Sequence, residues 1–135
     1  MSQYMLVLYD NPADYADLGL QELSSLVQHY VDWMDGLKKS GHYVTSFKLG
    51  AVEGRLLTTG GSRPVPSDGP YAEAKDVIGG AFVIEARDMA DAEAIARGSP
   101  HLRGRNTIEI RLLDNDSCSD TIQKGAEAAR QLVHG

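Results

Sequence analysis

Residues 68–75, with the sequence DGPYAEAK, lead directly into the most apolar run of the chain, residues 77–86. The Asp-Gly-Pro start predicts a tight turn, because Gly tolerates positive φ and Pro keeps the preceding residue out of the α region. The apolar run predicts a central strand, and its two glycines, Gly79 and Gly80, indicate a bulge or a close backbone approach. A rigid turn beside a buried strand is typical of a binding site.

The rest of the chain alternates between strand and helix patterns. Apolar residues at helical spacing predict a long amphipathic helix over residues 20–40, which Gly41 ends. Residues 107–113 alternate and predict a strand with one apolar and one polar face. Two further strands are expected, one at 4–9 buried on both faces and one at 42–49 with Tyr43, Thr45 and Phe47 on one face. Residues 51–66 predict a loop or a short hairpin, with a candidate edge strand at 55–59. A short helix at 89–97 capped by Asp88 and a second amphipathic helix at 120–134 complete the expected elements.

This order of elements predicts an α+β fold, with a ferredoxin-like antiparallel sheet and helices on one of its faces. The opposite face then has no cover within one chain. Because the central strand is strongly apolar, we expect a homodimer that forms by stacking the two bare sheet faces.

Composition excludes several classes of function. The chain has 13 basic and 19 acidic residues among its 135, and its net charge of -6 argues against nonspecific binding of nucleic acid. Cys118 is the single cysteine, so neither an intrachain disulfide nor a cysteine-rich metal site is expected. The start of the chain is unlike a signal peptide, and no run reaches the ~20 apolar residues of a membrane span. We therefore expect a cytoplasmic protein that does not bind membranes.

The chain resembles the YCII-related proteins and, within them, the branch named for a DGPF motif. The specific match is DGPYAEAKDVIGGAFVIE at residues 68–85, and weaker matches lie at residues 4–9, 33–41 and 108–111. The resemblance covers residues 1–113 and leaves 114–135 as a C-terminal helical extension. It implies a dimeric α+β barrel, in which two ferredoxin-like sheets face each other, with a pocket in each subunit.

Two positions depart from the family pattern. The Phe of the motif is Tyr71 here, which adds a hydroxyl group to the loop. Other YCII members resemble enzymes that pair a His on the first helix with an acidic residue. Tyr30, rather than the adjacent His29, aligns with that helix position, so the His–acid pair does not transfer to this chain.

The candidate catalytic residues are Asp68, Tyr71, Glu73 and His29. A phenol and a carboxylate close together suit proton transfer or the binding of a polar ligand; alternatively, Tyr71 packs on the core and Glu73 is solvated. Asp68 either holds the turn or faces the pocket. His29 either reaches a pocket or lies in solvent at the edge of its helix.

The pocket candidates are Tyr30, Glu85, Glu109 and Arg111. Glu109 and Arg111 share one strand face by the period of two. If that face is the interior of a barrel, the carboxylate needs a partner, which Arg111 supplies. The alternatives are a structural ion pair or a solvent-exposed polar face.

These residue types favour a protein that binds a small polar or aromatic molecule in a pocket. If it is an enzyme, proton transfer of isomerase or lyase type without a metal or organic cofactor fits them best. The alternative is a non-catalytic interaction or regulatory module that acts through a protein partner, with residues 114–135 as the docking element.

Overall fold

The computed structural model describes residues 1–16, 18–50, 53–64, 77–114 and 118–134. The predicted Asp-Gly-Pro turn, and with it Asp68, Tyr71 and Glu73, lies outside the described residues. Within the described ranges, none of the helices combines the length and the apolar character that crossing a membrane requires.

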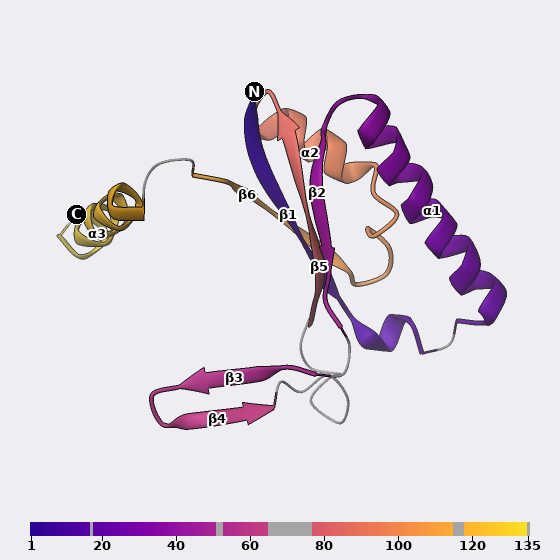
Figure 1. The fold of residues 1–135 in the computed structure, drawn as a ribbon, viewed down its shortest axis with the longest axis horizontal. Helices are drawn as coiled ribbons and strands as arrows, with labels where there is room; N and C mark the ends of the chain where they lie inside the picture. Colours follow the sequence, from indigo (N-terminus) through magenta and orange to yellow (C-terminus); the bar gives the residue numbers. More distant parts are fainter. Residues whose placement is uncertain (17, 51–52, 65–76, 115–117, 135) are drawn as a thin grey trace.

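One antiparallel sheet and two helices form the main body of the protein (Figure 1). Its elements are β1 (Ser2–Asp10), α1 (Leu20–Lys39), β2 (Tyr43–Lys48), β5 (Val77–Ala86), α2 (Met89–Arg97) and β6 (Thr107–Leu112). The strand order is β2-β5-β1-β6, and every neighbouring pair is antiparallel. This βαββαβ arrangement confirms the predicted α+β, ferredoxin-like fold.

Three further elements surround this body. A short 3-10 helix, η1 (Pro12–Asp14), follows β1. The hairpin of β3 (Arg55–Thr58) and β4 (Gly61–Pro64) forms a separate two-stranded sheet, and α3 (Cys118–His134) follows β6. Both the hairpin and α3 project away from the four-stranded sheet (Figure 1).

The helix ends follow the local sequence. Gly41 adopts a left-handed φ of 81°, while the amide of His42 donates to the carbonyl of Leu37 and that of Gly41 to the carbonyl of Lys38. These two bonds form a Schellman motif, which explains why α1 stops where Gly41 predicted. The Asp88 side chain accepts a hydrogen bond from the Asp91 amide at 2.8 Å and caps α2, as expected.

The hydrophobic core lies between the two helices and one face of the sheet. Leu6 and Ile84 are fully buried there, and Trp33 of α1 meets the Phe82 ring edge-on with centroids 4.8 Å apart. In β1 only alternate residues are buried, and Met5, Val7 and Tyr9, on the opposite face, are half-buried. The prediction that this strand is buried on both faces was therefore wrong for the single chain.

The two glycines of β5 have the predicted structural role. The pairing of β1 with β5 shifts register between Leu8 and Tyr9, which pair with Gly80 and Ile78, so that Gly79 is the additional residue of a bulge. A Cβ on Gly79 would collide with the carboxylate of Asp10, and one on Gly80 would lie 2.5 Å from the Phe47 carbonyl oxygen. These positions accept no side chain without movement of their neighbours.

A second register shift changes the predicted faces of β2. Tyr43 pairs with Ile84, and Thr45 pairs with Val83, so the shift lies between Tyr43 and Thr45. Because Ile84 and Val83 are consecutive, they point to opposite faces of the sheet. Tyr43 therefore packs on the core side, whereas the prediction placed it on the same face as Thr45 and Phe47.

Replacing Gly80 with Ala should destabilise the fold. The new Cβ meets backbone rather than a flexible side chain, and forced overpacking costs about 1–3 kcal/mol. Urea denaturation followed by circular dichroism measures the change. Gly36→Ala is the matched control, because Gly36 lies within α1 with nothing within 4 Å of the added Cβ, and Ala there should stabilise the helix by up to about 1 kcal/mol. A Gly80→Ala protein as stable as the wild type would contradict this account of β5.

Candidate functional site

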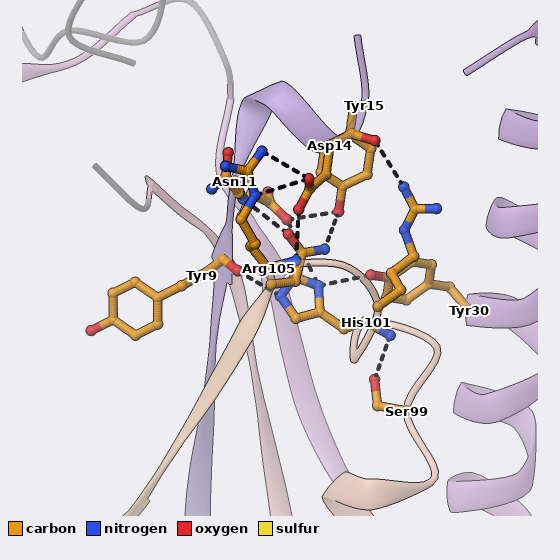
Figure 2. A network of polar contacts seen from close by, with 11 residues as sticks. Tyr9, Asn11, Asp14, Tyr15, Tyr30, Ser99, His101 and Arg105 are labelled. Atoms are coloured by element: carbon orange, nitrogen blue, oxygen red, sulfur yellow. Dashed lines mark hydrogen bonds and ion pairs between the residues drawn. The ribbon is translucent and has the colours of Figure 1, made fainter. Parts of the chain in front are cut away.

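A buried histidine lies at the centre of a polar cluster beside the end of β1 (Figure 2). His101 belongs to the loop between α2 and β6 and is 1% exposed. Its Nε2 lies 2.9 Å from the carbonyl oxygen of Tyr9, and its Nδ1 lies 2.8 Å from the hydroxyl of Tyr30. A carbonyl only accepts, so Nε2 carries the proton, and in the neutral ring Nδ1 accepts the hydrogen bond that Tyr30 donates.

A carboxylate and a second phenol complete the cluster. Oδ1 of Asp10, the last residue of β1, lies 3.7 Å from Nδ1 of His101. The Tyr15 hydroxyl donates to the same Oδ1 at 3.0 Å and accepts from the side-chain amide of Asn106 at 2.7 Å. Asp10 is thus the charged partner that a protonated His101 would have.

Polar contacts hold the segment after β1 against the loop before β6. The Asn106 side chain accepts from the Asn11 amide at 2.9 Å. Asp14 accepts from the Arg105 amide at 2.7 Å and forms an ion pair with the Arg105 guanidinium at 3.1 Å (Figure 2). These contacts, above all the backbone hydrogen bond from Arg105, lower the pKa of Asp14. The Arg103 guanidinium lies over the Tyr15 ring, 4.9 Å from its centroid.

The cluster forms one end of a cavity of about 510 Å³ between α1 and the helix-facing side of the sheet. Apolar residues of α1 cover it, and Leu8 and Phe82 contribute from the sheet. Its polar end consists of Asp10, Tyr15, Tyr30 and His101, while Ser46 and Lys48 border it along β2. An apolar wall with a few convergent polar groups is the usual composition of a small-molecule site.

Burial sets the protonation of the two phenols. It is the largest cause that raises the pKa of Tyr30, with the nearby Tyr15 and Asp10 acting in the same direction. Burial also raises the pKa of Tyr15, and the charge of Asp10 contributes. Both phenols therefore keep their protons at neutral pH, which leaves Tyr30 as a hydrogen-bond donor to His101.

The structure separates Tyr30 from its neighbour His29. Tyr30 lies in the cavity, whereas His29 lines an open groove with Glu22, Ser25 and Arg103. Successive residues of a helix differ by about 100° in direction, because one turn takes 3.6 residues. His29 is therefore not brought together with the Asp10–His101 cluster.

The other sheet residues singled out in the sequence lie away from this cavity. Glu109 and Arg111 share the face opposite the helices and pair there at 3.2 Å. The Tyr9 hydroxyl donates to Glu109 at 2.8 Å, and these two hydrogen bonds lower the pKa of Glu109. Glu85 is half-buried between Ile84 and Ala86, both of which face the core, so it too belongs to the open face.

Sequence reasoning missed three members of the cluster: Asp10, Tyr15 and His101. Tyr30 and His101 are 71 positions apart, and no short motif connects them. The useful signal was Gly79, because a side chain at this position would collide with the carboxylate of Asp10.

The fold and the cavity define a class: a ferredoxin-like α+β protein with a pocket between its helices and its sheet. The model of the YCII-related domain family matches residues 2–113, and the chain belongs to this family. No curated protein matches the sequence.

The pairing of Asp14 with Arg105 predicts a pH-dependent contribution to stability. The pKa of Asp14 is lower in the folded protein, so its contribution is present above the ordinary carboxyl pKa of about 3.9 and is lost as pH falls through the folded value. Asp14→Asn should therefore lower the Tm at pH 7, and its Tm should converge with that of the wild type in acid.

Thermal unfolding followed from pH 7 down to pH 2 measures this convergence. Asp32→Asn is the control, because Asp32 accepts one hydrogen bond from Gln28 on the exposed surface of α1 and should change the Tm little. A Tm difference for Asp14→Asn that is equal at all pH values would contradict the assignment.

Proposed function

We propose that this YCII-family protein binds a small molecule with an aromatic or apolar body in the cavity and transfers a proton to and from it. The reaction class is an isomerisation or an elimination of lyase type, and the chain's own residues supply the acid–base chemistry without a metal or organic cofactor. One observation carries the proposal: the Tyr30 hydroxyl, bonded to His101 beside Asp10, lies at the polar end of an otherwise apolar cavity.

The hydrogen bonds define a two-proton relay. A C–H bond next to a carbonyl group of the ligand breaks, its proton goes to the Tyr30 oxygen, and its electron pair enters the carbonyl as an enolate. At the same time the proton of Tyr30 passes to Nδ1 of His101. The raised pKa of Tyr30 favours this coupled transfer, because a free phenolate in the site would be unfavourable.

The surroundings of His101 suit the cation that the relay produces. Nε2–H already donates to the Tyr9 carbonyl, and the Asp10 carboxylate lies 3.7 Å from Nδ1. Both stabilise an imidazolium ring. Return of the proton to a different carbon completes an isomerisation, whereas departure of a β-substituent from the enolate completes an elimination.

Several expectations from the sequence extend this proposal. We place the chain in the DGPF branch and in the dimeric α+β barrel class, and we infer a cytoplasmic homodimer that forms over the open sheet face. The support is a group of apolar side chains on that face, beside the Glu109–Arg111 pair: Met5 and Val7 are half-buried and Phe47 is 55% exposed. The single cysteine is compatible with a reducing compartment. On the sequence alone, Asp68, Tyr71 and Glu73 stay candidates for the same site.

Replacing Tyr30 with Phe tests the relay, because it removes the hydroxyl group and leaves the ring in the cavity. A thermal-shift screen of small aromatic carbonyl compounds first identifies a ligand, and proton NMR in D₂O then measures exchange of its C–H proton for deuterium. Tyr30→Phe should slow the enzyme-dependent exchange by about 10² or more, as loss of a general acid–base group does.

Two further variants make this result specific. Tyr4→Phe removes a phenol from a buried position in the core outside the cavity lining and should keep wild-type exchange. His29→Gln should also keep it, because His29 lies in the other groove. If His29→Gln stops the exchange while Tyr30→Phe does not, or if no compound undergoes exchange with the wild type, the relay is wrong.

The second candidate function is a protein-interaction module, and one observation favours it. The apolar side chains of Ile122, Leu132 and Val133 on α3 are 67%, 88% and 77% exposed, and α3 projects away from the sheet (Figure 1). Amphipathic helices with an uncovered apolar face commonly dock on partner proteins.

Deleting residues 114–135 separates the two candidate functions. If the proton relay is the function, the truncated chain should bind ligand and exchange its proton at the wild-type rate, because none of the described residues that line the cavity belongs to α3. Isothermal titration and the NMR exchange assay measure both properties. Loss of a protein partner in affinity capture after the deletion would support the interaction module, and the absence of ligand exchange in both the full and the truncated chain would make it the function in place of the relay.

A further inference from the structure

Lys48 introduces a positive charge into the lining of the cavity. It is the last residue of β2 and, like Ser46 two positions earlier, points to the helix-facing side of the sheet, where it borders the cavity. Across the described residues, the observed ion pairs are those of Arg87, Arg97, His101, Arg105 and Arg111, and none involves Lys48. Its ammonium group is thus available to a ligand.

The glycine pair separates Lys48 from the acid–base cluster. Lys48 and Leu8 both pair with Gly80, from opposite sides of β5. Two strand spacings therefore separate Lys48 from Leu8 of β1. Their two Cα atoms lie ~10 Å apart. Gly79 and Gly80 line the cavity between them, and a flat ligand body lying over β5 would have one end at Lys48 and the other toward Tyr30.

The helix α1, which lines the cavity opposite the sheet, contributes exposed apolar side chains. Leu23, Val27 and Val31 line the cavity from α1 and are 37%, 61% and 38% exposed. An apolar ligand body that covers them gains free energy from their burial. It also removes water from the neighbourhood of Lys48, and an ion pair with Lys48 is stronger in such a setting.

Asp10, which borders the same cavity, does not neutralise Lys48. Its Oδ1 accepts from Tyr15 and lies near His101, and its side chain fits against the bare backbone of Gly79. A ligand with a negative charge is therefore attracted at the β2 side and kept from turning end to end by Asp10 at the β1 side.

We infer that the cavity selects organic anions: carboxylic acids with an aromatic or branched apolar body, whose carboxylate pairs with Lys48 while the reacting carbon faces Tyr30. The inference rests on the proposed function in that it concerns the same cavity. It adds the substrate class and makes Lys48 the residue that determines specificity.

Matched acid and amide probes test this inference on the full chain. Isothermal titration at pH 7.5 compares 2-naphthoate with 2-naphthamide, which has nearly the same shape and no charge. The wild type should bind naphthoate at least about 10-fold more tightly, a preference expected for a charge-assisted pair. Lys48→Met should lose the preference through weaker naphthoate binding, while its affinity for naphthamide stays at the wild-type value and shows that the cavity is intact.

Two other variants sharpen the result. Lys48→Arg keeps the charge and should keep the preference for the acid. Lys39→Met removes a lysine from the exposed end of α1, outside the cavity lining, and should bind both probes as the wild type does. Equal affinity of the wild type for acid and amide, an acid preference that survives Lys48→Met, or no binding of either probe overturns the inference.

Failure of this inference differs from failure of the proton relay. If the cavity binds both probes equally and Tyr30→Phe still slows proton exchange of a neutral carbonyl ligand, the relay stands and the role of Lys48 is wrong. If the acid preference depends on Lys48 but exchange does not depend on Tyr30, the anion site stands and the proposed reaction is wrong.

Discussion

The hydrogen bond from the buried Nε2–H of His101 to the Tyr9 carbonyl is the contact on which the site depends. It joins the loop between α2 and β6 to the end of β1 and fixes the tautomer of the ring. With Nε2 occupied, Nδ1 is the ring nitrogen left to face Tyr30 and Asp10. The same contact thus positions the loop and leaves Nδ1 as the proton acceptor of the proposed relay.

The glycine pair in β5 is the second constraint, and it acts by leaving room for neighbouring atoms. Gly79 accommodates the Asp10 carboxylate, and Gly80 allows β2 to approach closely at the Phe47 carbonyl. A Cβ at either position would collide with these neighbours. The two glycines lower the stability of the strand, because glycine contributes no side-chain packing to a sheet. The hydrophobic core around Leu6 and Ile84 compensates for it.

Much of the fold was predictable from local patterns, whereas the site was not. The periodicity of residues 20–40 and the alternation of residues 107–113 each specify an element and its buried face without reference to the rest of the chain. Asp10, Tyr30 and His101 come from three distant segments, and their meeting depends on the register shift at Leu8 and Tyr9, which no local pattern encodes.

The difference between His29 and Tyr30 also shows that a local pattern does not specify which residue enters the site. Both residues belong to one helix and carry groups suited to proton transfer, and the sequence singled out both as candidates. Their directions differ by about 100°, so only one of them reaches the space above Gly80. An alignment of this helix that is wrong by one residue would therefore assign the groove residue His29 to the cavity in place of Tyr30.

The open face of the sheet carries a charged pair that is satisfied within that face. On the open face, the carboxylate of Glu109 accepts from Tyr9 and pairs with Arg111, and its lowered pKa keeps that pair ionised at neutral pH. A paired and hydrogen-bonded carboxylate tolerates burial far better than a lone one. Stacking of two such faces would therefore bury Glu109 without an unpaired charge and leave the cavity under α1 open on the other side. Association and ligand binding would then be physically separate functions of the same four strands.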